Sequence, residues 1–167
     1  MNAWPRPDFG LLRYGKKLLF YPFSRTRGCS RRCEFCTVKS APRWSEPERL
    51  YEQIAWLADT RKAKHFFITD DRLNEDAAGT REFFRLIAAA KKSSRLPKNL
   101  NFTVQIRLET ARELDLLRLM RQAGVNMVCV GYESPIAAEL NAMRKGIKTS
   151  DMVDYTRIFK REGFWVH

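Results

Sequence analysis

Apolar residues recur along this chain with two different periods. Apolar runs of strand length occupy residues 17–23, 65–69, 101–107 and 126–132, and a fifth begins at residues 164–166. Between the runs, apolar residues recur every three or four positions, the period of an amphipathic helix, in segments that begin near residues 45, 79, 110, 136 and 150. Strands that alternate with helices in this way predict βαβ units and a parallel sheet.

Local signals mark the ends of two helices. Ser45 is predicted to cap the first helix, with Pro47 in its first turn and Glu48 completing a capping box. Gly124 is predicted to end the helix over residues 110–122, because glycine is a usual helix stop.

The alternating pattern stops within a unit at residues 164–166. A parallel sheet left open there would expose an apolar edge strand, which proteins normally cover. We therefore expect an α/β fold, a parallel partial (β/α) barrel that is truncated at its C-terminal end. Residues 1–15 are rich in Pro, Gly and Arg and are typical of a linker or arm. Residues 16–167 are expected to form the incomplete barrel domain.

Composition narrows the class of protein. The 167 residues are 44% hydrophobic and 30% charged, enough for one globular domain. No apolar run approaches the ~20 residues of a membrane span, and the N-terminal residues lack the apolar core of an export signal. We expect a cytoplasmic location, where four cysteines indicate metal binding or catalysis rather than disulfides.

The chain is strongly basic, with 31 Lys and Arg residues against 19 Asp and Glu and a net charge of +12. Such an excess could serve nucleic acid or a membrane surface. However, the basic residues are spread along the chain and no recognisable nucleic-acid module accompanies them. Solvated helix faces are therefore the preferred interpretation, and a nucleic-acid partner is the less favoured one.

Three cysteines are gathered in one short loop. Cys29, Cys33 and Cys36 form a Cys-x3-Cys-x2-Cys sequence, and Phe35 precedes the last of them. Thiolates so close in sequence can converge on one metal centre, and iron–sulfur clusters are ordinarily held by four such thiolates. Three ligands leave one iron open to an exogenous ligand, the arrangement that distinguishes catalytic from structural metal sites.

This loop resembles the signature of the radical SAM superfamily, in which the motif follows a first strand and an aromatic residue precedes the last cysteine. The resemblance covers about residue 16 to the end and is most specific at residues 27–38. It implies a barrel of radical-SAM type, a 4Fe–4S cluster on Cys29, Cys33 and Cys36, and S-adenosylmethionine (SAM) with Phe35 beside its adenine. It also implies an enzyme: SAM chelates the open iron and is reductively cleaved to methionine and a 5′-deoxyadenosyl radical.

The main alternative for the three cysteines is a structural zinc site. Such a site requires a fourth ligand, for which Cys129, His65 and His167 are candidates. None of these residues offers the second Cys-x2-Cys or His pair that zinc modules usually carry. The nearby arginines Arg25, Arg27, Arg31 and Arg32 have two open interpretations: they offset the charge of a negative cluster, or they attract a phosphorylated partner.

Alternation along two strands predicts a polar interior. Side chains alternate across a strand, so Gln105 and Arg107 share a face opposite the apolar residues of 101–107. Because unpaired polar burial is costly, both are predicted to line a cofactor site, with an exposed strand face as the alternative. Cys129 shares the inward face of its strand with Glu133 but lies roughly 13 Å deeper, at ~3.3 Å per residue. It is therefore predicted to pack in the barrel rather than to ligate.

Asp70 and Asp71 follow the second strand, where radical SAM enzymes commonly present a Gly-Gly-Glu-like segment to the amino group of SAM. Residues 66–71 depart from that pattern and resemble the variant of cobalamin-associated branches. An aspartate can accept hydrogen bonds from an ammonium group, so Asp70 or Asp71 is expected near SAM. A turn or helix cap is the alternative.

Gly131-Tyr132-Glu133-Ser134 is similar to a Gly-Ile-Glu-Ser segment of the same branches. The resemblance implies that Glu133 and Ser134 lie near the ribose or methionine part of SAM, and a surface loop is the alternative. Lys145 belongs to a similar basic stretch, and a solvated helix end is the preferred interpretation of it over a carboxylate partner.

The same branches often use cobalamin, here through a region not in this chain, for methyl transfer or a related rearrangement. The resemblance further implies a small-molecule substrate and an electron donor such as flavodoxin or ferredoxin. Two other classes stay open: a zinc-stabilised basic binding module and a catalytically inactive fragment.

Overall fold

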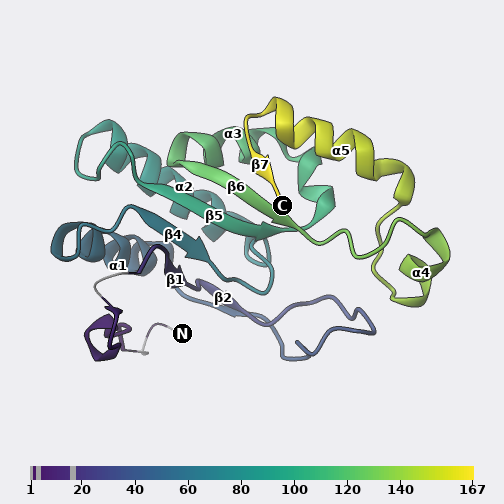
Figure 1. The fold of residues 1–167 in the computed structure, drawn as a ribbon, viewed down its shortest axis with the longest axis horizontal. Helices are drawn as coiled ribbons and strands as arrows, with labels where there is room; N and C mark the ends of the chain where they lie inside the picture. The colour runs from purple at the N-terminus through teal and green to yellow at the C-terminus, as the bar shows by residue number, and fades with distance from the viewer. Residues whose placement is uncertain (1, 3–4, 16–17) are drawn as a thin grey trace.

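One parallel sheet forms the centre of the computed structural model, which describes residues 2, 5–15 and 18–167 (Figure 1). Its strand order is β1-β4-β5-β6-β7, and every neighbouring pair is parallel. The strands are Tyr21–Phe23 (β1), His65–Ile68 (β4), Asn101–Ile106 (β5), Val125–Val130 (β6) and Trp165–Val166 (β7). The predicted α/β fold with a parallel partial barrel is confirmed.

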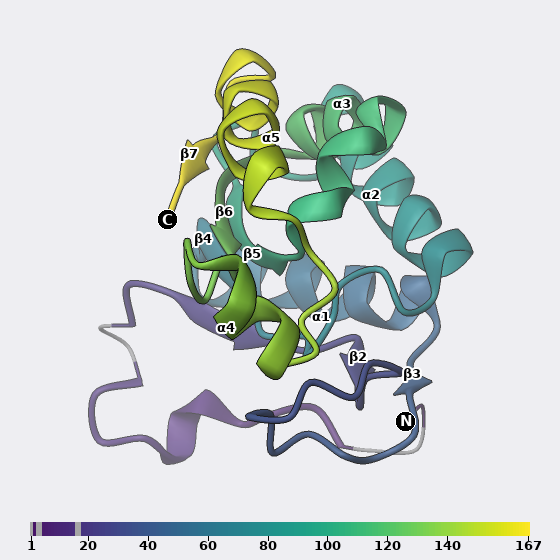
Figure 2. The same ribbon diagram turned by 90° about the vertical axis from the view of Figure 1, so that its right-hand side faces the viewer.

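Helices connect the strands and cover one face of the sheet. They are α1 (Pro47–Thr60), α2 (Ala77–Lys92), α3 (Leu114–Ala123), α4 (Ala137–Ala142) and α5 (Thr149–Arg161), with 3-10 turns η1 (Phe9–Leu11) and η3 (Leu108–Arg112). Figure 2 shows α1, α2, α3 and α5 in an arc on the same side of the strands. None of the helices in the described ranges has both the length and the apolar character that crossing a bilayer demands.

The hydrophobic core lies between the sheet and these helices. Phe66, Phe102 and Val104 are fully buried, and the Phe66 and Phe102 rings stack with centroids 5.7 Å apart. The opposite face of the sheet is open, since Gln105 and Met127 are exposed there. The core therefore forms on the helix-covered side, and the open side is left for a site.

Two predicted element boundaries were wrong. The first strand begins at Tyr21 rather than near residue 17, because Leu19 and Phe20 are exposed; Lys17 lies outside the described residues. Ser45 does not cap α1: the N-cap is Glu46, which makes no side-chain capping bond. The Ser45 amide instead donates to Arg25 O at 2.9 Å, so Ser45 stays outside the helix.

A short hairpin that the sequence pattern did not predict brackets the cysteine loop. Its antiparallel strands are Thr26–Arg27 (β2) and Arg43–Trp44 (β3). The helix predicted over residues 110–122 is divided into η3 and α3, and Gly124 ends α3 as predicted.

Candidate cofactor site

The cysteine loop lies at the end of the molecule toward which the strands run, and α4 lies at the same end (Figures 1 and 2). Gly28 begins the loop with φ +87°, and a Cβ there would lie 2.4 Å from the Ala41 carbonyl oxygen. The Cys29 amide donates to Ser40 O at 3.3 Å. Glycine at position 28 thus lets the two ends of the loop approach closely.

A pocket of about 200 Å³ separates this loop from the ends of β5 and β6. Its wall joins residues from five segments far apart in sequence: the cysteine loop, the loop after β4, the ends of β5 and β6, and the segment after α4. The predicted site residues in this wall are Cys29, Cys33, Phe35, Cys36, Asp71, Gln105, Arg107 and Glu133. The fold therefore brings together eight of the ten, and Asp70 and Ser134 lie outside.

The three loop cysteines are free thiols in this pocket. Cys33 is buried, and Cys29 and Cys36 are partly buried. Burial raises the pKa of the Cys29 thiol, and the neighbouring Glu75 carboxylate acts in the same direction. Because the thiolate is the reactive form, Cys29 is poorly suited to act as a free nucleophile.

The donor set fits an iron–sulfur cluster. Within the described residues, no three His, Cys, Asp or Glu side chains are disposed around a single metal ion. A cluster makes a different demand, because each thiolate binds a different iron and the sulfurs need only surround one cavity. Cys29, Cys33 and Cys36 meet that demand, since all three line the same pocket.

Asp70 and Asp71 have separate roles in the structure. Asp70 is 1% exposed, and its Oδ1 accepts from the Arg25 amide at 2.7 Å and the Thr26 amide at 2.9 Å. Burial raises the pKa of the Asp70 carboxyl, against the opposing effect of these hydrogen bonds. Asp71 lies in the pocket wall and accepts from the Gly28 amide at 2.7 Å. Of the two, Asp71 is the one positioned to meet a ligand.

Glu133 and Lys145 form an ion pair at the edge of the pocket. The Lys145 Nζ donates to Glu133 Oε1 at 2.5 Å, and their side chains are 9% and 30% exposed. Glu133 has φ +66°, an uncommon conformation for a residue other than glycine. The preferred interpretation of Lys145 as a solvated helix end was wrong, because the residue is buried and bonds to Glu133 and Arg107.

Arg107 connects the end of β5 to the segment after α4. Its Nε donates to Glu109 Oε1 at 2.5 Å, and an Nη donates to Lys145 O at 2.7 Å. Gln105 precedes it on the same open face, opposite Cys129 in the strand register. Cys129 also lines the pocket, and burial raises the pKa of its thiol.

Phe35 is half exposed at the pocket edge, with the Lys145 Nζ 5.5 Å from its ring centroid. Ser134 is buried outside the pocket, where its hydroxyl donates to Glu139 and accepts from the Ile136 amide. Ser134 thus orders the start of α4.

The pocket wall also includes two arginines outside the ten predicted residues, Arg31 and Arg72. The position of Arg31 agrees with the interpretation that it offsets the charge of a cluster, and Arg72 carried no signal because it follows a strand as ordinary loop residues do. The proposed alternative zinc ligand His65 bonds to Asn101 at the start of β5, away from the pocket.

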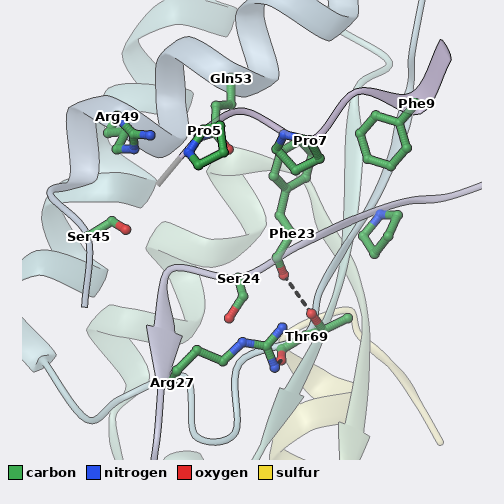
Figure 3. A pocket seen from close by; sticks show the side chains of 11 residues that line it. Pro5, Pro7, Phe9, Phe23, Ser24, Arg27, Ser45, Arg49, Gln53 and Thr69 are labelled. Carbon is green, nitrogen blue, oxygen red and sulfur yellow. Dashed lines mark hydrogen bonds between the residues drawn. The ribbon is translucent and has the colours of Figure 1, made fainter. Parts of the chain in front are cut away.

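A second pocket, of about 280 Å³, lies between the N-terminal arm, α1 and the end of β1 (Figure 3). Pro7, Phe9 and Phe23 give it an apolar wall, and Thr69 donates to Phe23 O at 2.9 Å along one side. None of the ten predicted site residues lines this pocket. The predicted reactive groups converge instead on the first pocket, which we call the cysteine pocket.

Comparison with known proteins agrees with this geometry. Residues 23–167 match the family described as the radical SAM superfamily. The chain belongs to this superfamily. Membership implies an iron–sulfur cluster and SAM as cofactors.

Curated relatives and solved structures extend the comparison. The anaerobic magnesium-protoporphyrin IX monomethyl ester cyclase of Synechocystis is 29% identical over 167 positions, covering 95% of this chain and 32% of the relative. The hopanoid C-2 methylase of Rhodopseudomonas palustris is 25% identical over 150 positions, covering 87% of this chain and 28% of the relative. The chain thus spans about a third of the length of these relatives.

The fold is shared with the radical SAM methyltransferase TsrM from Kitasatospora setae, in a structure with tryptophan and a SAM analogue. The TM-score is 0.78 at 19% identity, covering 99% of this chain and 32% of TsrM. The cobalamin-dependent radical SAM enzyme OxsB, with aqua-cobalamin and SAM bound, gives 0.74 at 17% identity, covering 87% and 23%. OxsB is a cobalamin-dependent enzyme, and TsrM has also been solved with cobalamin and a 4Fe–4S cluster bound.

Proposed function

We propose that this chain is the catalytic core of a radical SAM enzyme, with a 4Fe–4S cluster held by Cys29, Cys33 and Cys36. The observation that carries the proposal is the convergence of the three cysteines with Asp71, Arg107 and Glu133 on one pocket at the strand ends. When bound, the cluster and SAM would supply a 5′-deoxyadenosyl radical by reductive cleavage of SAM.

The side chains of the pocket support SAM as the ligand. SAM carries an ammonium and a carboxylate, and the Glu133–Lys145 pair presents one charge of each sign at the pocket edge. Ionised partners make the stronger hydrogen bonds, so we assign Glu133, Arg107 and Asp71 to the polar groups of SAM. Phe35 offers a half-exposed ring for the adenine, and Gln105 is assigned a supporting contact.

The test is anaerobic reconstitution with iron and sulfide, followed by EPR of the reduced protein with and without SAM. We expect a 4Fe–4S signal that changes when SAM is added and is absent from a Cys33→Ala control. A cluster whose EPR signal does not change on addition of SAM would indicate a catalytically inactive fragment. Stoichiometric zinc without acid-labile sulfide would indicate the zinc-stabilised basic binding module.

We further propose that the natural protein couples this site to cobalamin, for methyl transfer or a related rearrangement of a small molecule. The support is that the hopanoid methylase, TsrM and OxsB are all similar to this chain. Titration of the whole natural protein with cobalamin tests this, and failure of cobalamin to bind or to raise turnover would overturn it. A flavodoxin or ferredoxin would be the cytoplasmic electron donor.

A further inference from the structure

A row of carboxylates faces the first part of the cysteine loop. The loop between β4 and α2 contains Asp70, Asp71, Glu75 and Asp76, and we call residues 70–76 the carboxylate loop. Each of its four acids binds a residue of the segment 24–30. We call this segment the front arm, because it contains Cys29 and the residues before it.

Three of the acids bind backbone amides in succession. Asp70 accepts from the Arg25 and Thr26 amides, and Asp71 accepts from the Gly28 amide at 2.7 Å. Glu75 then accepts from the Ser30 amide at 2.8 Å and from its hydroxyl at 3.0 Å. Amides on both sides of Cys29 are therefore held by carboxylates.

The fourth acid anchors the arm through a buried arginine. Arg25 is 2% exposed, and its guanidinium donates to Asp76 Oδ2 at 2.8 Å, Thr80 Oγ1 at 2.9 Å and Asp76 O at 3.1 Å. A further bond to Ser45 O at 3.3 Å reaches the segment before α1. Arg25 therefore neither offsets the charge of a cluster nor attracts a phosphorylated partner. It is buried, and it joins the front arm to the start of α2.

The rest of the cysteine loop is held by other means. The Glu34 amide donates to Met143 O at 3.0 Å, and the Cys36 amide donates to Cys33 O within the loop. Glu34 therefore contacts the segment after α4, and Arg31 pairs with Glu109 of η3. The two halves of the cysteine loop are attached to different parts of the fold.

We infer that the carboxylate loop is a positioning element for Cys29, with the Arg25–Asp76 pair as its anchor. It orders the front arm in the cluster-free protein, so one of the three thiols is in place before iron arrives. The inference deepens the proposed function, on which its relevance to the cluster rests, but the ordering itself is a property of the cluster-free chain.

Amide hydrogen exchange of the cluster-free protein tests the ordering. We expect the amides of residues 26, 28 and 30 to be protected, and Arg25→Met to lower that protection roughly tenfold or more while β5 amides keep theirs. The matched control is Arg85→Met, which removes an arginine from an exposed pair with Glu82 on α2. Uniform loss across the sheet, or equal behaviour of the two variants, would overturn the inference.

Glu75 supplies a second, milder test in case Arg25→Met fails to fold. Glu75→Gln keeps an oxygen that can accept from the Ser30 amide, whereas Glu75→Ala does not. We expect Glu75→Ala to lose protection at residue 30 and Glu75→Gln to restore it. Equal exchange at residue 30 in both variants and the unaltered protein would overturn the assignment.

Iron binding then connects the ordering to the cluster. Residues that orient metal ligands typically contribute 10–100-fold to metal affinity. We therefore expect the Arg25→Met variant to bind iron roughly tenfold more weakly during reconstitution and to give a changed EPR line shape. The Arg85→Met variant should behave like the unaltered protein in both measurements. Unchanged iron affinity would overturn the positioning role and leave the proposed function standing. No cluster in the unaltered protein would defeat the proposed function, while hydrogen exchange would still decide the ordering.

Discussion

At the scale of single residues, the site depends on which of two adjacent side chains faces which way. Asp70 and Asp71 are chemically alike, yet Asp70 is buried against the backbone of residues 25 and 26, and Asp71 lines the pocket. Both residues follow β4 in the loop before α2, and they differ in the amides that they bind: Arg25 and Thr26 for Asp70, and Gly28 for Asp71.

Asp70→Ala should be strongly destabilising and Asp70→Asn mild. Alanine leaves the Arg25 and Thr26 amides without their acceptor, which should cost about 3 kcal/mol. Asparagine keeps one oxygen, and burial already disfavours the charged form of Asp70, so we expect a loss of about 1 kcal/mol or less. Urea unfolding at neutral pH measures both, and equal losses would contradict the role assigned to the oxygen.

The acid stability of the fold should depend on Asp76. Burial opposes its ionisation, but hydrogen bonds from Arg25 and the Gly79 amide outweigh this and lower the pKa of the Asp76 carboxyl. A group whose pKa is lower in the folded state stabilises the fold above its unfolded value, about 3.9 for Asp. That contribution is lost as the pH falls through the folded value.

Asp76→Asn should therefore destabilise the chain at neutral pH and flatten the fall in stability below about pH 4. Urea unfolding at several pH values measures the profile. Asp154→Asn is the control, because Asp154 is in an exposed pair with Arg157. Parallel acid profiles for Asp76→Asn and the unaltered protein would contradict the prediction.

At the scale of elements, the segment that follows α4 joins β5, β6 and the cysteine loop. Lys145 contributes its ammonium to Glu133 at the end of β6 and its carbonyl to Arg107 at the end of β5. Met143 O receives the Glu34 amide. Through these contacts Lys145 becomes part of the pocket wall, whereas its neighbour Arg144 stays exposed.

Lys145→Met should lower the free energy of unfolding by about 1–2 kcal/mol, because Glu133 loses its partner in a partly buried position. Arg144→Met is the matched control. Its pair with Glu34 is exposed on both sides, so we expect a change within about 0.5 kcal/mol. Urea unfolding measures both, and equal effects would show that burial of Lys145 is unimportant.

At the scale of the whole molecule, the hydrophobic core lies on the helix-covered face of the sheet, and the cysteine pocket lies at the ends of β5 and β6. The core cluster includes residues of β1, β4, β5, β6 and the covering helices, and none of Cys29, Cys33 and Cys36 belongs to it. A fold built in this way does not require a metal to bury its apolar surface.

We therefore expect the chain to keep its structure when metal is removed. After treatment with a chelator, far-UV circular dichroism should retain its helix and strand signal, and thermal unfolding should remain cooperative. Zinc-stabilised modules behave in the opposite way, since they unfold without their metal. Loss of structure on chelation would favour that alternative.

Local pattern was enough to predict much of the fold. The order of strands and helices, the buried face of β5 and the end of α3 followed from periodicity and from Gly124, because these features depend on neighbours in sequence. The hairpin that closes the cysteine loop was missed, because two-residue strands carry no period. The cap of α1 was wrong, because a distant residue, Arg25, fixes Ser45.

For the site, the sequence by itself determined the chemistry: three closely spaced cysteines, and acidic and basic residues at strand ends. Only the tertiary structure decided which of these groups meet. In the structure Asp71 lines the pocket and Asp70 does not. Lys145 is buried against Glu133, and Arg25 is buried and paired with Asp76 at the start of α2. The physical reason is that burial and ion pairing depend on segments 12 to 51 residues apart in sequence, and no local period encodes those contacts.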